Sequence, residues 1–308
     1  METATHPLVS VGRTIPATPP DVFHAWTTPD LLEKWFAPTV EYDAHVVALD
    51  PRVGGAYRTE MRHELGANHT MSGEYRAVDP PHGLTFTMDG HEGDPPSTVE
   101  VRIATHQDGA HVTLTQTGLA SDDEADRHAE GWDGFLWRLA NTFEPTTAYH
   151  RALVLALHRR LFANALEGLD DDLDRRLAAA NDARWIAAHL AQSRAGLAAM
   201  LGAPIDHPLQ AFADAVPDDT PTPDAETIRR VFAEASHAVY RGLQHASDQD
   251  LAGPPPFTIP MRAQTLLAAV DFLVSHEAYH IGQLGLLRRA LGYPAMRYDH
   301  HGDGRDDR

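Results

Sequence analysis

Residues 275–292 read SHEAYHIGQLGLLRRALG, and this stretch indicates the architecture of the C-terminal half of the chain. On an α-helix, which turns about 100° per residue, positions three and four apart share a face. One such face collects Leu273, His276, His280, Leu284, Leu287 and Leu291. Two histidines are therefore predicted near the centre of the face that packs into a core, whereas Asp271 and Arg289 are expected to face solvent.

The two histidines need partners, because a buried imidazole costs free energy unless its ring nitrogens are satisfied. His276 and His280 are four residues apart, which places both rings over one point in space and suits the chelation of one cation. Alternatively, the two rings bond to each other, to the backbone or to Glu277.

A second helix offers a third imidazole. Residues 182–201 read DARWIAAHLAQSRAGLAAML, and their apolar face includes Ile186, Leu190, Leu197 and Met200. His189 lies at the edge of this face, beside Ser193. Three protein ligands would leave one or more positions for water or substrate, which is typical of catalytic rather than structural metal sites.

Four helices are predicted in this half of the chain, over residues 147–167, 182–201, 224–246 and 264–291. Asp224 can cap the third helix. The expected fold is an all-α four-helix bundle over residues 146–296, followed by a disordered tail over 297–308. The histidines expected on the bundle surface are His150, His158 and His237.

The N-terminal half has a different pattern, in which β-branched and aromatic residues alternate with polar ones between turn residues. Seven strands are predicted, over Val9–Ile15, Tyr42–Leu49, Gly55–Met61, His69–Val78, Leu84–Met88, Thr98–Ala104 and Ala110–Thr117. Two short helices are expected after Pro19-Pro20 and Pro29, and a longer helix over Asp122–Phe143. This order predicts an α+β domain over residues 1–145, with a curved antiparallel sheet around the long helix.

The composition excludes several classes of protein. The 25 basic and 44 acidic residues give a formal charge of −19, and nucleic-acid binding rests largely on Lys and Arg, so no nucleic-acid partner is expected. No apolar run approaches the roughly 18 residues of a membrane span, and the first residues lack the features of a secretory signal. Since the chain has no cysteine, disulfides, thiolate ligands and a cysteine nucleophile are excluded. We expect a cytoplasmic protein with no membrane partner.

Two stretches carry a family resemblance, WIAAHLAQSR at 185–194 and HEAYHIGQL at 276–284. Together with the four-helix pattern they resemble the DinB/YfiT-like superfamily over about residues 147–296. The resemblance implies a divalent metal held by His189, His276 and His280; zinc, nickel and iron all accept imidazole ligands. It also implies transferase or isomerase chemistry with a low-molecular-weight thiol, which must come from outside a chain without cysteine.

Three stretches of the N-terminal half resemble the START-like (SRPBCC) superfamily, in the branch related to the ATPase activator of heat-shock protein 90. They are VSVGRTIPATPPDVFHAWTTPDLLEKWFAP at 9–38, SGEYRAVDPPHGLTFT at 72–87 and GWDGFLWRLANTF at 131–143. The resemblance implies a helix-grip fold whose cavity holds an apolar small molecule. The candidate lining residues are Trp26, Trp35, Tyr57, Phe86, Trp132 and Phe135. Alternatively, these aromatic residues simply form the core.

Two hypotheses of function follow. The first is a metal-dependent enzyme, either a thiol-dependent S-transferase or a hydrolase, in which Glu277 acts as a base or orients a ligating histidine. The second is a non-enzymatic ligand-binding or stress-response protein with a structural metal. A chaperone partner would rest on fold analogy alone and is not expected. The resemblance also implies that the chain can form a homodimer.

Overall fold

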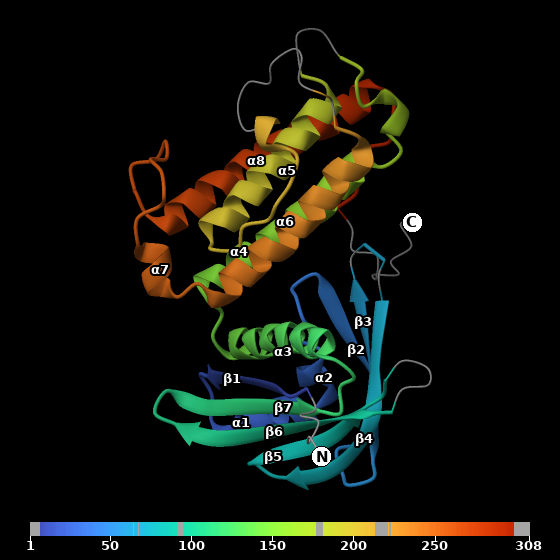
Figure 1. Cartoon of the computed structure of the whole chain (residues 1–308), viewed down its shortest axis with the longest axis vertical. Helices are drawn as coiled ribbons and strands as arrows, with labels where there is room; N and C mark the ends of the chain where they lie inside the picture. Colours follow the sequence, from blue (N-terminus) through green and yellow to red (C-terminus); the bar gives the residue numbers. More distant parts are fainter. Residues whose placement is uncertain are drawn as a thin grey trace, which may run out of the picture. The chain divides into compact units, whose positions relative to one another are not determined.

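The structure is a computed structural model that describes residues 7–63, 65–66, 68–90, 95–176, 181–212, 221 and 223–298. The chain divides into two compact units, Met1–Thr146 and Thr147–Arg308, which are blue to green and green to red in Figure 1. They are called the N-terminal unit and the C-terminal unit, and each is described by itself. The predicted tail lies outside the described residues from position 299 onward.

The N-terminal unit is built on one seven-stranded antiparallel sheet with the order β1-β7-β6-β5-β4-β3-β2. Its strands are β1 (Val9–Ile15), β2 (Tyr42–Leu49), β3 (Ala56–His63), β4 (Asn68–Asp79), β5 (Gly83–Met88), β6 (Ser97–His106) and β7 (Gly109–Thr117). Buried residues alternate with more exposed ones along β7, as in a strand with one face against a core. The register shifts between Val46 and Ala48 and between Tyr75 and Ala77, and such bulges bend strands and help a sheet to curl.

The long helix α3 (Asp122–Phe143) lies along the concave side of the curled sheet (Figure 1). It begins at Ser121, whose side chain accepts a hydrogen bond from the Glu124 amide. Two short helices, α1 (Pro19–Thr27) and α2 (Pro29–Leu32), both begin with proline. All three helices and the sheet share one apolar core. The predicted α+β helix-grip fold is therefore confirmed.

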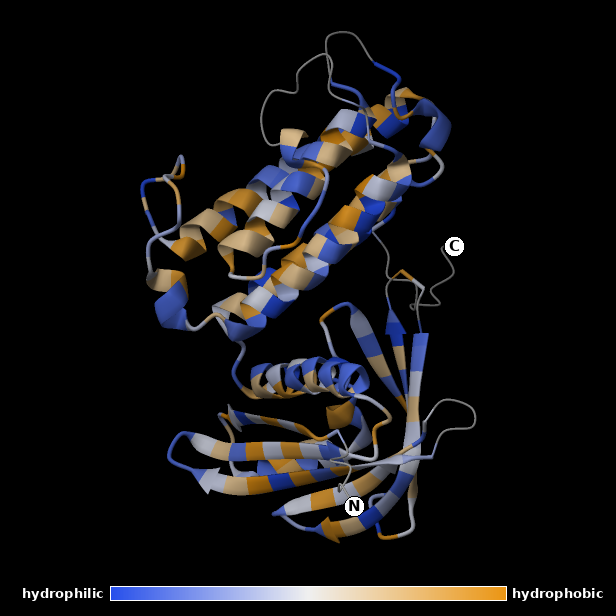
Figure 2. Cartoon of the chain, viewed as in Figure 1, coloured by the Kyte–Doolittle hydropathy of each residue, from blue (hydrophilic) through white to orange (hydrophobic). Residues whose placement is uncertain are grey.

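The C-terminal unit is a bundle of four long helices, α4 (Thr147–Leu166), α5 (Ala183–Met200), α6 (Ala225–His245) and α8 (Leu266–Ala290). Apolar and polar residues alternate around each of them (Figure 2). Shorter elements are η1 (Asp170–Asp172), η2 (Gln210–Phe212) and α7 (Asp248–Ala252). The predicted all-α bundle is confirmed, and Asp224 caps α6 as expected. Among the described residues, none of the helices is long and apolar enough to cross a membrane.

The buried face of α8 differs from the predicted one. Its buried residues include Glu277 and Arg288 beside Ile281 and Leu284, whereas His276 and His280 are only half-buried. The prediction that the two histidines lie at the centre of the core face was wrong. It did not allow for a charged residue, Glu277, at the centre of that face. Glu277 occupies that position since cationic and polar partners from the other helices surround it in the core.

One of those partners corrects a second expectation. His158 on α4 was expected on the surface, yet its exposed fraction is 6%. Its Nδ1 atom lies 3.3 Å from a carboxylate oxygen of Glu277. A polar residue of a helix can therefore face the bundle interior when a buried charge on another helix receives it.

Candidate metal centre

The structure brings the three predicted metal ligands together. His189 lies on α5, and His276 and His280 lie on α8. The Nε2 atom of His276 is 3.1 Å from Nε2 of His189 and 3.1 Å from Nε2 of His280. The three rings are turned by 71° to 73° to one another. Within the described part of the chain, this is the one group of three or more His, Asp and Glu side chains whose ligand atoms could share an ion.

The outer nitrogens of two rings are held by hydrogen bonds. His189 Nδ1 lies 2.8 Å from the Phe212 carbonyl oxygen, and His280 Nδ1 lies 2.7 Å from Oε1 of Gln283. A carbonyl or amide oxygen accepts only, so each Nδ1 must donate its hydrogen. In a neutral imidazole this leaves the lone pair on Nε2. Both Nε2 lone pairs therefore point inward, which is the tautomer that a metal ion requires.

The nitrogen spacing suits one ion. Imidazole nitrogens bound to zinc at about 2.0–2.1 Å lie roughly 2.9–3.4 Å apart, for angles of about 90–110° at the ion. Both 3.1 Å separations fall in that range. A single hydrogen atom among the three rings would satisfy their Nε2 lone pairs less well than a metal ion. A hydrogen on His276 Nε2 can be donated to one neighbouring ring, which leaves the lone pair of the other without a partner.

The electrostatic surroundings favour the neutral form of two of the rings, those of His276 and His280. Burial, and then the neighbouring His280 and His189, lower the pKa of His276 to about 4. Burial also lowers the pKa of His280, against the opposing effect of its hydrogen bond to Gln283. Since metal ligation needs the unprotonated imidazole, these two rings are ready to bind a cation at neutral pH.

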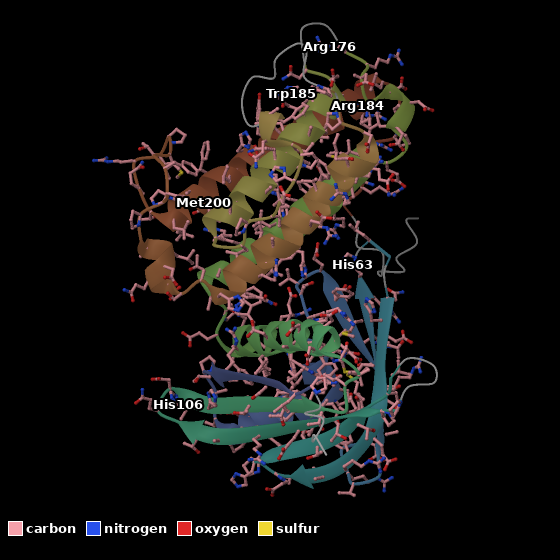
Figure 3. All side chains as sticks on the ribbon, viewed as in Figure 1. His63, His106, Arg176, Arg184, Trp185 and Met200 are labelled. Carbon is pink, nitrogen blue, oxygen red and sulfur yellow. The ribbon has the colours of Figure 1, made fainter. Side chains whose placement is uncertain are left out.

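Each imidazole also has an aromatic neighbour. The indole ring of Trp185 stacks on His189, with ring centroids 5.1 Å apart and planes 11° from parallel. The ring of Phe272 lies 6.2 Å from His276, and that of Tyr279 lies 5.0 Å from His280. Figure 3 labels Trp185 near the N-terminal end of α5, whereas Met200 marks its other end. These rings restrict the orientations that the three imidazoles can adopt.

Glu277, the predicted base or orienting group, lies between His276 and His280 in the sequence, but its carboxylate contacts groups outside the triad. Its carboxylate accepts hydrogen bonds from Nε and Nη2 of Arg194 and lies in contact with His158. Burial by itself would raise the pKa of Glu277, but the charge of Arg194 and the close approach of His158 more than reverse this effect. Glu277 is therefore a buried carboxylate with a pKa below its ordinary value.

Two features of the site are absent from the predictions made from the sequence, the contact from Phe212 and the stacking of Trp185. The ligand orientation by Phe212 comes from a backbone carbonyl in η2, and no side-chain pattern announces such a contact. Trp185 precedes His189 by four residues, so its place on the same helical face was visible in the sequence. Gln283 lies within HEAYHIGQL, the stretch that carries the family resemblance, and this was the available signal for its place at the site.

The six aromatic residues predicted to line a cavity are all buried in the N-terminal unit. Trp26 contacts Trp35 at a centroid distance of 4.6 Å, and Tyr57 contacts Phe86 at 5.3 Å. Trp132 and Phe135 are 4.9 Å apart.

Phe36, which the sequence analysis missed, connects these aromatic groups. Its ring lies 6.0 Å from Trp26 and 4.8 Å from Phe135. Its position directly after Trp35 in the sequence was the available indication that Phe36 joins this aromatic cluster.

Comparison with known families matches both units. A model described as Activator of Hsp90 ATPase homolog 1-like protein matches residues 16–144, and a model described as DinB superfamily matches residues 107–284. The second match covers more than half of the chain and includes all three histidines. Among curated proteins there is no match.

Several solved structures are similar to part of the chain. A protein from Chromobacterium violaceum has 27% identity and a TM-score of 0.42, covering 46% of this chain and 99% of the other. A protein from Mycobacterium smegmatis has 22% identity and a TM-score of 0.41, with coverages of 47% and 96%. An AHSA1-like protein from Aeromonas hydrophila has 28% identity and a TM-score of 0.39, with coverages of 44% and 92%.

Proposed function

Because this chain belongs to the DinB superfamily and carries an N-terminal domain like the activator of Hsp90 ATPase, we propose that it is a metal-dependent enzyme. In this proposal His189, His276 and His280 hold one divalent ion, for which zinc, nickel and iron are the candidates. The reaction is the transfer of an external low-molecular-weight thiol to an electrophile, with hydrolysis as the related alternative.

One observation carries the proposal. Two of the three imidazoles donate Nδ1–H to fixed oxygen acceptors, those of Phe212 and Gln283, while their Nε2 atoms face His276. This pairing of an inward lone pair with an outward donor is the usual arrangement around a metal-bound histidine. A histidine cluster that served only packing would not need both outer nitrogens to be fixed in this way.

The ligand set also supports a reactive site. Three neutral imidazoles leave the full double charge of an ion uncompensated, and such an ion makes a coordinated thiol or water markedly more acidic. In the transfer, the sulfur forms a bond to the electrophilic carbon, the leaving group departs with its electron pair, and the thiol proton passes to water. Glu277 is not required as a base in this scheme, since Arg194 and His158 already bind its carboxylate.

Metal content of the purified protein tests the first part of the proposal. The parent is expected to hold about one equivalent of a divalent metal, and the His189→Ala and His280→Ala variants are expected to lose it. His237→Ala is the matched control, because His237 is an exposed histidine on α6 of the same bundle. A parent that takes up no metal after reconstitution, or triad variants that keep it, would contradict the proposal.

Thiol-dependent turnover tests the second part. Glutathione, cysteine and N-acetylcysteine would each be incubated with monobromobimane and the metal-loaded protein. We expect turnover with at least one thiol, above the uncatalysed rate, and its loss in His280→Ala but not in His237→Ala. If metal is bound but an ester is hydrolysed and no thiol is consumed, the hydrolase alternative is favoured.

A specific observation in the N-terminal unit favours a second function, the binding of an apolar small molecule. The indole nitrogen of Trp26 is buried and has no hydrogen-bond partner among the described residues. An unsatisfied buried donor costs free energy, and a ligand with an acceptor atom would remove this cost. Anilinonaphthalene sulfonate is a suitable probe, and Trp26→Phe is expected to weaken its binding several-fold. Equal binding by both proteins would argue against this function.

A further inference from the structure

We propose that the buried Arg194–Glu277 pair is a positioning device, which fixes α5 against α8 so that His189 meets His276 and His280. The inference deepens the proposed function and rests on it for the metal. The hydrogen bonds described for Arg194 and Glu277 join them to each other and to α4 and α6. The role of the pair is to fix the register of α5 against α8, the two helices that carry the imidazoles.

The pair is the centre of a network with a group from every long helix of the bundle. From α5, Arg194 donates Nε to Glu277 Oε2 on α8 over 2.8 Å, and its Nη2 bonds the other carboxylate oxygen. Its Nη1 donates to Ser236 Oγ on α6 over 3.1 Å, and Nη2 also reaches the Leu155 carbonyl on α4 over 3.3 Å. Nδ1 of His158 on α4 lies 3.3 Å from Oε1 of Glu277, the same oxygen that Nη2 of Arg194 bonds.

Burial makes this arrangement demanding in geometry. Arg194 has an exposed fraction of 0% and Glu277 of 3%, and the guanidinium lies 4.7 Å from the ring centroid of Phe232. A buried ion pair adds little net stability over apolar residues of the same size, but breaking it by removing one partner is strongly destabilising. A two-pronged guanidinium–carboxylate contact also has one preferred relative orientation. The pair therefore selects one register of the helices more than it strengthens the bundle.

The same register is the one that the imidazoles need. Glu277 follows His276 directly on α8, and Arg194 is five residues beyond His189 on α5. Sliding α8 by one residue moves each side chain by about 1.5 Å along the axis and turns it by about 100°. Such a shift would break both the two-pronged contact and the 3.1 Å approach of His189 to His276. An apolar pair of similar volume would fill the space but would not penalise this shift.

The test replaces both charges together, so that no buried charge is left alone. The variant is Arg194→Met/Glu277→Met, and Arg194→Lys is a second variant that keeps the charge but loses the fork. The matched control is Arg151→Met/Asp271→Met. It removes a partly exposed ion pair between α4 and α8, which does not connect the two helices of the triad.

Two readouts separate positioning from stability. The first is the affinity and visible spectrum of Co²⁺, used alone as the metal probe. The second, measured without metal, is the distance distribution between spin labels on Ala199→Cys and Ala290→Cys. These alanines are exposed on α5 and α8, and the chain has no cysteine of its own to compete for label.

We expect the double methionine variant and Arg194→Lys to lose Co²⁺ affinity by at least ten-fold and to broaden the label distances, while the control matches the parent. Unchanged Co²⁺ affinity and an unchanged label-distance distribution in both variants would overturn the inference. The proposed metal site would not be affected by that result. If the parent binds no Co²⁺, the proposed function fails, and the label distances still decide whether the pair sets the register. Should the double variant not fold, Arg194→Lys carries the test alone.

Discussion

Individual side chains determine how the candidate site responds to acid. The pKa of His276 falls from its ordinary 6.5 to about 4, chiefly through burial, and that of His280 falls in the same direction. In the unfolded chain both imidazoles take up protons near pH 6.5, whereas in the folded chain they resist protonation. Stability is therefore fully present above about pH 6.5 and is lost as the pH falls toward 4.

The melting temperature of the metal-free protein tests this reasoning. We expect it to fall between pH 7 and pH 5, and to fall less steeply in His276→Ala, which lacks one of the two groups. His237→Ala, which removes an exposed histidine, should follow the parent. Parallel curves for His276→Ala and the parent would contradict the role of His276.

Gln283 is expected to act through His280. Its Oε1 accepts from His280 Nδ1, and its amide nitrogen donates to the Tyr279 hydroxyl over 3.0 Å. Loss of a group that orients a metal ligand typically costs about 10- to 100-fold in metal affinity. Gln283→Ala should therefore weaken metal binding by that amount, as measured by competition with a chromophoric chelator.

Tyr279→Phe is the control for this measurement, because it removes only the outer hydroxyl and keeps the contact between Gln283 and His280. Equal affinity in Gln283→Ala and the parent would show that His280 needs no orientation from Gln283.

The residues that meet at the site were predictable to different degrees. His276 and His280 share a helical face by spacing alone, and His189 could be added because its helix was visible as an apolar pattern. The contact from Phe212 was not predictable, because it uses a backbone carbonyl whose position depends on the path of a long connection. Arg194 carried no signal in the sequence, since an arginine in a helix is ordinarily a surface residue.

At the scale of elements, the helix ends follow their capping residues. The Asp182 side chain accepts a hydrogen bond from the Trp185 amide over 2.8 Å at the start of α5. Replacing such a cap with alanine typically costs about 1 kcal/mol. Asp182→Ala is therefore expected to lower the free energy of unfolding of the C-terminal unit by about that amount, measured by urea denaturation. Asp182→Asn should remain close to the parent, because asparagine caps a helix equally well; a loss as large as that of alanine would assign the effect to charge instead.

The helices were easier to predict than the faces they bury. Apolar periodicity and capping residues gave the extents of α5, α6 and α8, since both are local in sequence. The orientation of α8 was misjudged because apolar periodicity counts a glutamate as solvent-facing. Whether Glu277 can be buried depends on Arg194, Ser236 and His158, which come from three other helices.

For the whole molecule, the two units should respond differently to metal. A ligand present at 100 times its dissociation constant stabilises the folded state by about 2.7 kcal/mol. For a unit of this size that corresponds to a rise of about 5–10 °C in melting temperature. Calorimetry is expected to show this rise for the transition of the C-terminal unit and no rise for that of the N-terminal unit.

The His189→Ala variant supplies the control for the calorimetry, and neither of its transitions should respond to metal. A shift of the N-terminal transition in the parent would mean that this unit binds metal as well, contrary to the single ligand cluster found among the described residues.

The hydrogen bond from His189 to the Phe212 carbonyl has a consequence for how the chain can change over evolutionary time. The connection between α5 and α6 would ordinarily accept insertions and deletions freely, as surface segments do. Here, residues between the end of α5 and Phe212 bring that carbonyl to a ligand of the candidate site. Natural variants should therefore conserve the length of the segment before Phe212 more strictly than its sequence. A deletion there would displace the carbonyl that orients His189, and selection would act against the loss of metal binding rather than against a loss of folding.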